Sequence, residues 1–92
     1  MSYKVVITEE AAKDLAALPV SLRNALKREL SRLADDPVRS SRRSVSPPYP
    51  PGQMYQFECV VRDRRHLLTV LFRYSSDERT LVIFGIGRQE LD

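Results

Sequence analysis

The feature that most constrains this fold is a run of predicted β-strands separated by short turns, across residues 54–88. Three strands at 54–62, 66–74 and 80–87 are joined by a tight turn at Asp63-Arg64 and a second turn at 75–79. The first two strands alternate apolar and polar side chains, which is the period of a strand with one buried face. The third is apolar on both faces, so we expect it in the interior of a sheet.

The alternation also predicts which side chains form the core. Four residues of each of the first two strands are expected on the buried face: Tyr55, Phe57, Cys59 and Val61, then Leu68, Val70, Phe72 and Tyr74. The opposite face is expected to present Glu58, Arg62, Thr69 and Arg73. Because Cys59 falls on the buried face, packing is its expected role.

The first 37 residues predict one short strand and two helices. Residues 3–7 are β-branched and apolar enough for a buried strand. Thr8 is suited to cap a helix over residues 9–18, which Pro19 ends. The apolar side of this helix is expected to hold Ala12, Leu15, Ala16 and Leu18.

A second helix is predicted from Val20 or Ser21 to Ala34, and Asp35-Asp36-Pro37 ends it. Its apolar stripe repeats at three- and four-residue spacing through Leu22, Ala25, Leu26, Leu30 and Leu33. The expected fold class is therefore α+β. An N-terminal strand is followed by a two-helix hairpin that packs on an antiparallel sheet of about four strands.

Residues 37–53 interrupt this pattern and are predicted to form a loop rich in proline, serine and arginine. Five of the chain's six prolines lie there, and proline disfavours both helix and sheet interiors. The loop also carries Arg39, Arg42 and Arg43. A basic arm of this kind is suited to contact a phosphate backbone.

Composition narrows the function classes. The 92 residues are expected to form one domain spanning 1–92, with a net charge of +3 in which arginine supplies 12 of 15 cations. Residues 37–74 hold seven arginines against two acids, which indicates a polyanion or an acidic partner. The chain lacks a membrane-spanning run and a signal-peptide pattern, and its single cysteine fits a reducing compartment. We expect a cytoplasmic protein.

The available side chains suit phosphodiester chemistry without a metal or other cofactor. One histidine and one cysteine do not make a zinc site, and the chain has no Walker loop. RNA supplies its own nucleophile in the 2′-hydroxyl, so a protein needs to orient it, transfer protons and neutralise phosphate charge. Arg73 and Arg88 are candidates for the phosphate, and His66 or Glu58 for proton transfer.

The order of elements resembles the RelE/ParE superfamily of toxins from bacterial toxin–antitoxin pairs. The matching segments are Tyr3-Lys-Val-Val-Ile-Thr, Glu9-Glu10-Ala-Ala-Lys-Asp-Leu, Leu18-Pro19, Leu30 to Pro37, His66-Leu-Leu-Thr-Val-Leu-Phe-Arg and Val82-Ile-Phe-Gly-Ile-Gly-Arg. The resemblance implies a small toxin inhibited by a cognate antitoxin. RelE-like members cut mRNA on the ribosome, whereas ParE-like members poison DNA gyrase. Arg88 matches the family's catalytic arginine after the last strand's glycine, and Arg65, His66 and Arg73 lie where its basic strand residues fall.

Three hypotheses follow from these observations. The first is a toxin that cuts mRNA on the ribosome, with catalytic Arg88, Arg73, His66 and Arg65, and with Arg39, Arg42, Arg43, Arg62 and Arg64 binding nucleic acid. The second is a non-catalytic member, either a gyrase poison or an inactive homologue that only binds an antitoxin. It is favoured because Gln-Glu-Leu-Asp without a tyrosine follows Arg88, and because the family's usual lysines are missing. The third is a basic nucleic-acid-binding module without toxicity.

Overall fold

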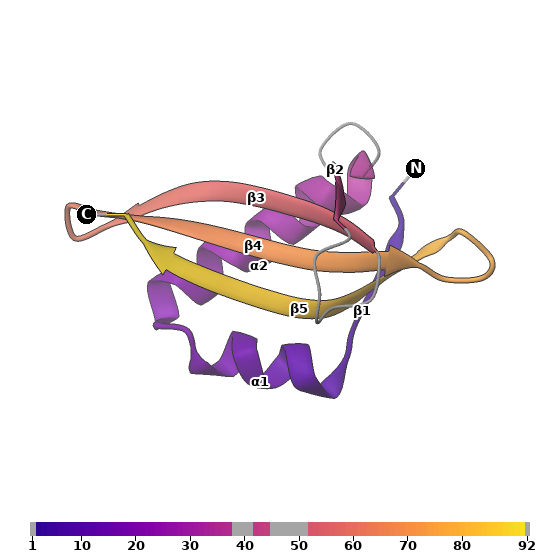
Figure 1. The fold of residues 1–92 in the computed structure, drawn as a ribbon, viewed down its shortest axis with the longest axis horizontal. Helices are drawn as coiled ribbons and strands as arrows, with labels where there is room; N and C mark the ends of the chain where they lie inside the picture. The colour runs from indigo at the N-terminus through magenta and orange to yellow at the C-terminus, as the bar shows by residue number, and fades with distance from the viewer. Residues whose placement is uncertain (1, 38–41, 45–51, 92) are drawn as a thin grey trace.

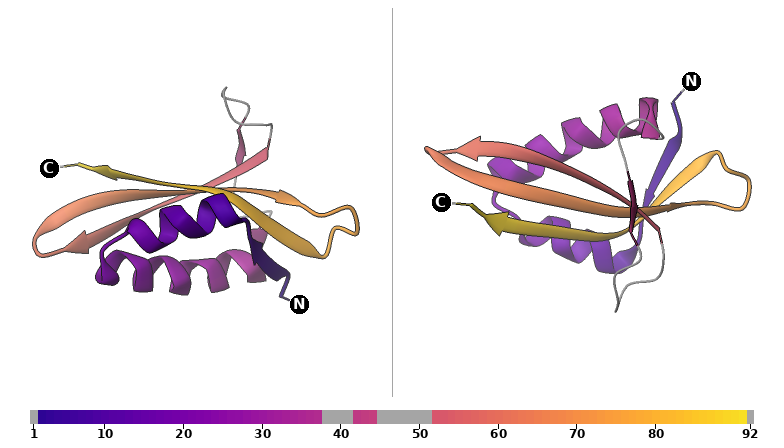
Figure 2. Two further views of the ribbon diagram at one scale, coloured as in Figure 1. Left: turned by 90° about the horizontal axis from the view of Figure 1, so that it is seen from below. Right: turned by 45° about the horizontal axis from the view of Figure 1, so that its top comes forward.

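A computed structural model describes residues 2–37, 42–44 and 52–91 of the chain. The elements in chain order are β1 (Lys4–Ile7), α1 (Glu9–Ala17), α2 (Val20–Asp35), β2 (Arg42–Ser44), β3 (Gly52–Val61), β4 (Arg64–Tyr74) and β5 (Thr80–Glu90). The strands form one sheet in the order β1-β5-β4-β3-β2 (Figure 1). Figure 2 shows both helices on the same side of this sheet. We call that side the helix face and the other the outer face.

The predicted α+β class and the helical hairpin on one side of the sheet are confirmed. The sheet differs from the prediction because one of its strand pairs is parallel. β1 pairs with β5 in parallel, from Lys4↔Thr80 to Ile7↔Ile83, and the other pairs are antiparallel. Short turns impose antiparallel pairing, but the helical hairpin that follows β1 removes this restriction.

A short strand lies inside the segment that was expected to be a loop. β2 pairs antiparallel with β3 through Arg42↔Met54, Arg43↔Gln53 and Ser44↔Gly52. It escaped prediction because a three-residue strand carries too little periodicity to be recognised. Within the described residues it is the last strand of the sheet, so it needs ladder hydrogen bonds on one side only. Residues 38–41 and 45–51 of the predicted loop lie outside the described residues.

The helices confirm the predicted hairpin, with one change of face in α1. Thr8 caps α1 by accepting a hydrogen bond at Oγ1 from the N–H of Ala11 at 3.2 Å. Ala11 is fully buried, whereas Ala12 and Ala16 are exposed, so the predicted apolar side was wrong at those two positions. Alanine marks a helix face weakly, and the larger Leu15 and Leu18 orient α1. In α2 the predicted stripe is buried throughout: Leu22, Ala25, Leu26, Leu30 and Leu33.

The core lies between the helices and the middle strands of the sheet. Leu68, Val70 and Phe72 of β4 are completely buried, which confirms the face predicted from their alternation. Leu81 and Ile83 of β5 are equally buried. The predicted partners on β3 are half-buried and pack against this core: Tyr55, Phe57, Cys59 and Val61.

The β3–β4 hairpin turns one residue earlier than predicted. Its two turn residues are Arg62 and Asp63, with φ angles of 52° and 64°, and Arg64 already belongs to β4. Two successive positive φ values define a type I′ turn, whose twist matches that of the flanking strands. Glycine or asparagine usually marks such a turn, but Arg62 and Asp63 occupy it here, so the sequence did not show its exact position.

A β-bulge in β5 decides which side chains share a face. Leu71 pairs with Gly85 and Phe72 with Ile83, so Phe84 is the additional residue. β5 then continues to Glu90, which places Arg88 within the strand instead of after it. The additional residue shifts the alternation by one, and the end of β5 keeps register with the helix-face residues of β4. This end and the β3–β4 hairpin project beyond the helices (Figure 1).

Candidate functional site

The projecting end of the sheet brings together ionisable side chains from β4 and β5 on the helix face. His66 pairs with Glu90, and Leu68 pairs with Arg88. Residues directly opposite each other in antiparallel strands point to the same side of a sheet, so His66, Arg88 and Glu90 share the face of the buried Leu68. Arg64 lies two residues before His66 and reaches the same group. We call Arg64, His66, Arg88 and Glu90 the hairpin-end cluster.

His66 is the buried member of this cluster. Its exposed fraction is 7%, and its Nδ1 atom is buried without a hydrogen-bond partner among the described residues. Its cross-strand neighbour on β3 is Cys59, which is half-buried and packs against the core, as expected. Buried polar atoms without a hydrogen-bond partner are uncommon in folded proteins, so this nitrogen marks His66 as a candidate functional residue.

Glu90 is the member that sequence reasoning missed. Arg64 donates a hydrogen bond from Nη1 to Glu90 Oε1, and the two side chains form an ion pair. This hydrogen bond, followed by the positive charge of Arg64, lowers the pKa of the Glu90 carboxyl group. Burial opposes this shift, and His66 and Arg88 lower the pKa by smaller electrostatic contributions. Glu90 could have been identified only from its pairing with His66. That pairing depends on the bulge in β5 and on where β5 ends, and the sequence showed neither.

The outer face carries the predicted residues that do not join the cluster. Arg65, Arg73 and Glu58 are exposed there, on the opposite side from His66 and Arg88. Arg73 lies five positions along β4 from Leu68, the partner of Arg88, which is about 17 Å at the rise of a strand. The structure therefore does not bring together the four predicted catalytic residues, because His66 and Arg88 lie on the helix face and Arg65 and Arg73 lie on the outer face.

The remaining predicted binding residues are spread over both ends of the sheet. Arg62 is exposed in the hairpin turn next to the cluster, and Arg64 belongs to the cluster itself. The backbone of Arg42 and Arg43 pairs with β3 at Met54 and Gln53, which is the other end of the hairpin strands. Arg39 lies outside the described residues.

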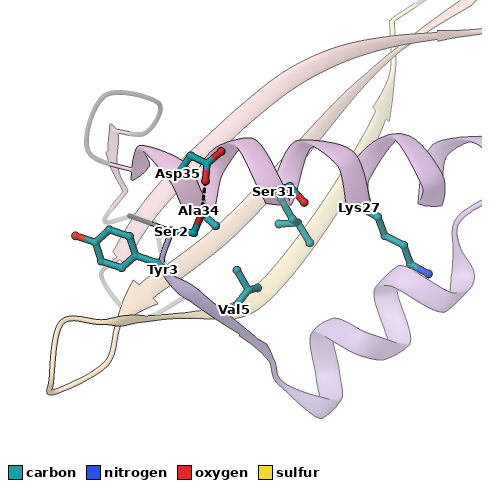
Figure 3. Close-up of a pocket in the computed structure, with 8 residues that line it drawn as sticks. Ser2, Tyr3, Val5, Lys27, Ser31, Ala34 and Asp35 are labelled. Carbon is teal, nitrogen blue, oxygen red and sulfur yellow. Dashed lines mark hydrogen bonds between the residues drawn. The ribbon is translucent and has the colours of Figure 1, made fainter.

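Two hollows in the described part of the protein lie away from this cluster. A pocket of about 410 Å³ opens between β1 and α2 (Figure 3). It is lined by Ser2, Tyr3, Val5, Lys27, Leu30, Ser31, Ala34 and Asp35. A neighbouring hollow of about 590 Å³ is bordered by Ser2, Tyr3, Glu78 and Arg79. We place the candidate site at the cluster because ionisable side chains from two strands meet there and the Nδ1 atom of His66 is buried without a partner among the described residues.

The pocket runs along the edge strand β1. The N–H group of Lys4 donates to the C=O of Arg79, directly before β5, at 3.1 Å, and that of Thr8 donates to the C=O of Ile83 in β5 at 2.9 Å. Backbone groups alternate in direction along a strand, so those of Val5 point away from β5 toward the pocket. At one end Ser2 donates a hydrogen bond to Asp35 (Figure 3). The pocket thus combines an open strand edge with the polar side chains of α2.

Two further properties of the described part of the chain concern metals and membranes. Its histidine, cysteine and acidic side chains form no group of three or more that would hold a metal ion. None of its helices has the length and hydropathy needed to cross a bilayer.

Comparison with known proteins identifies the fold. No protein-family model matches the chain, and neither does any curated protein. A chain of the toxin–antitoxin complex RelBE2 from Mycobacterium tuberculosis aligns with a TM-score of 0.71 and 22% identity. The alignment covers 97% of this protein and 100% of the RelBE2 chain. A chain of the intact Escherichia coli RelBE complex aligns at 0.68 and 15% identity, over 98% and 100%. The isolated Escherichia coli RelE toxin aligns at 0.67 and 16% identity, over 99% and 88%. This protein therefore has the fold of the RelE toxins.

Proposed function

We propose that this protein is the toxin of a toxin–antitoxin pair and cuts mRNA on the ribosome without a metal ion. The observation that carries the proposal is the hairpin-end cluster, in which Arg64, His66 and Arg88 share one face of a projecting sheet end. The fold supports the toxin assignment, because the similar structures are RelE toxins and RelBE complexes. The open position of the cluster supports a large, extended substrate.

Each member of the cluster has a distinct part in this reaction. The 2′-hydroxyl of the RNA attacks the adjacent phosphorus, and the bond from phosphorus to the 5′ oxygen of the next nucleotide breaks. Arg88 neutralises the charge that develops on the phosphate oxygens. His66 takes the proton of the 2′-hydroxyl, and the leaving 5′ oxygen gains a proton from water, so the products are a 2′,3′-cyclic phosphate and a 5′-hydroxyl end.

Arg65 and Arg73, which the sequence analysis placed in the catalytic set, take a different part in the proposal. They are exposed on the outer face, where they are suited to hold the phosphate backbone of the substrate or of ribosomal RNA. Glu58 lies on the same outer face, so Glu90 replaces it as the carboxylate nearest to the proposed chemistry.

Inducible expression in bacteria, followed by mapping of mRNA ends, tests the proposal. Arg88→Ala should lower the cleavage rate by roughly 10²–10³-fold, by analogy with the loss of one donor to a developing oxyanion. Arg73→Ala is the matched control, since it removes an exposed arginine from the other face, and it should lower the rate by less than about tenfold. Cleavage by Arg88→Ala at the wild-type rate would remove this residue from the mechanism.

The same experiment separates the alternative functions. Growth arrest without new mRNA ends would point to a gyrase poison, and a supercoiling assay with purified gyrase would then identify it. Antitoxin binding without growth arrest would indicate an inactive homologue. Binding to nucleic acid that weakens steeply with salt, with no toxicity, would indicate the simple binding module.

The partner that we propose is a cognate antitoxin, as in the RelBE complexes of similar structure. The pocket beside β1 is suited to an extended antitoxin segment, because backbone groups at Val5 point to it and Lys27 and Asp35 offer opposite charges. Val5→Pro would remove the outward N–H while leaving the pairing of Lys4 and Thr8 with β5. Co-purification with the product of the neighbouring reading frame should weaken in this variant. Unchanged co-purification of a folded variant would place the antitoxin elsewhere.

A further inference from the structure

Within the hairpin-end cluster, one carboxylate lies among three cationic or protonatable groups. Glu90 accepts a hydrogen bond from Arg64, pairs in register with His66 and lies two residues from Arg88 on the same face of β5. Three side chains from two strands therefore lie near the Glu90 carboxylate at the projecting end of the sheet. The geometry is that of an anion site, and the anion is supplied by the chain itself.

Carboxylate and phosphate compete for the same donors. The planar guanidinium group of arginine presents paired N–H donors whose spacing fits two oxygens of either anion. A phosphate that enters the cluster must therefore take the donors of Arg64 from Glu90. The lowered pKa of Glu90 agrees with this, because its carboxyl group is ionised and binds as an anion near neutral pH.

We propose that the Glu90 carboxylate occupies a phosphate site, and that an RNA phosphate binds Arg64 and Arg88 beside His66 by displacing it. The assignment of the anion to RNA rests on the proposed function, whereas the competition itself rests on the contacts of Glu90. Glu90 is thus a built-in competitor that lowers the affinity of the site for phosphates.

The ion pair between Arg64 and Glu90 is exposed, so another anion can readily replace the Glu90 carboxylate. The side chains of Arg64 and Glu90 are 66% and 40% exposed, and exposed ion pairs are weak and sensitive to salt. The backbone next to Glu90 is held, because the N–H of Leu91 donates to the C=O of Arg65 at 2.9 Å. Displacement therefore requires rotation of the Glu90 side chain and leaves the strand in place.

Binding of a 2′-O-methyl RNA oligonucleotide, measured by fluorescence anisotropy at low salt, tests this competition. The methyl group blocks the nucleophile, so binding is observed without cleavage. Glu90→Gln keeps the size of the side chain and removes its charge, and it should bind the oligonucleotide about two- to fivefold more tightly, since an exposed pair no longer has to be broken. Glu10→Gln, on the exposed first turn of α1, is the control for loss of one negative charge far from the cluster.

A double-mutant cycle shows whether the effect passes through Arg64. In an Arg64→Gln background, Glu90→Gln should give no more affinity than Glu10→Gln gives. The proposal is overturned if Glu90→Gln and Glu10→Gln change affinity equally in the wild-type background, or if the gain persists without Arg64. It is also overturned if Glu90→Gln binds more weakly, or if none of the proteins binds the oligonucleotide. A gain specific to Glu90→Gln in a protein that never cleaves mRNA would uphold the anion site and refute the nuclease.

Discussion

A hydrogen bond between α2 and β3 provides the sharpest test of how the two layers are held together. The hydroxyl group of Tyr55 donates to Glu29 Oε2 at 2.6 Å, a length typical of a bond to a charged acceptor. The side chain of Glu29 is 19% exposed, and it also accepts from Arg32 at 3.3 Å. Tyr55→Phe removes the hydroxyl group alone, because the ring and its stacking on Phe57 at 5.8 Å are kept.

We expect Tyr55→Phe to lower the free energy of unfolding by about 1.5 kcal/mol. Hydrogen bonds to charged groups contribute about 1.5–3 kcal/mol, and we take the lower end because solvent reaches Glu29. In a domain of this size each kcal/mol corresponds to about 4–8 °C, so the melting temperature should fall by about 6–12 °C. Urea denaturation followed by circular dichroism measures the free energy, and a thermal scan measures the temperature.

A double-mutant cycle with Glu29→Gln shows whether the loss belongs to this bond. The amide still accepts a hydrogen bond from Tyr55 but lacks the charge, so the coupling free energy between the two positions should be about 1 kcal/mol. The reasoning is refuted if Tyr55→Phe unfolds within about 0.3 kcal/mol of the wild type, or if the two substitutions are additive.

The same bond predicts how stability depends on alkaline pH. Burial, followed by the hydrogen bond to Glu29 and its negative charge, raises the pKa of Tyr55 from 10.0 to about 12. The folded protein therefore keeps this proton at a pH where the unfolded chain has lost it, and the stabilisation is complete below pH 10. It is lost as the pH rises toward about 12, so the stability difference between the wild type and Tyr55→Phe should shrink over that interval. Comparison with Tyr55→Phe removes the contribution of Tyr74, whose pKa burial also raises.

Three further substitutions test local features of the fold by thermal and urea denaturation. Thr8→Ala removes the cap of α1 and should cost about 1 kcal/mol, whereas Thr8→Ser should be nearly neutral; equal losses would contradict the capping role. Gly52→Ala places a Cβ 2.8 Å from the carbonyl oxygen of Phe72 and should cost about 1–3 kcal/mol, so an unchanged midpoint would show that β3 moves freely there. Replacing Arg62-Asp63 with Asn-Gly, the preferred type I′ pair, should stabilise the hairpin by about 0.5–1 kcal/mol, and a lower melting temperature would argue against that turn type.

Sequence reasoning was successful where the signal is local. The period of α2 identified its buried side, and the alternation along β4 identified Leu68, Val70 and Phe72 as core residues. It was less successful with α1, where alanines on two sides of the helix made its face ambiguous. The three-residue strand β2 has too few side chains to show any period.

The candidate site depended on long-range register. Arg88 and His66 were both singled out from the sequence, but their common face was not predictable. With uninterrupted alternation along β5, Arg88 would lie on the face of the sheet opposite to that of Ile83. The additional residue Phe84 places both side chains on the same face. Arg73 lies on the outer face of β4, as its alternation with Leu68, Val70 and Phe72 predicts, and so it does not share the face of Arg88.

The sequence by itself determined both helices, the four longer strands, most of the core and the arginine-rich composition, because these depend on side chains a few residues apart. Only the tertiary structure decided that Glu90 lies opposite His66, that Arg64 reaches it, and that Arg88 shares the face of His66. The physical reason is that one bulge residue changes the face of every side chain that follows it in a strand, and the pairing of that strand with its neighbour determines where the bulge lies.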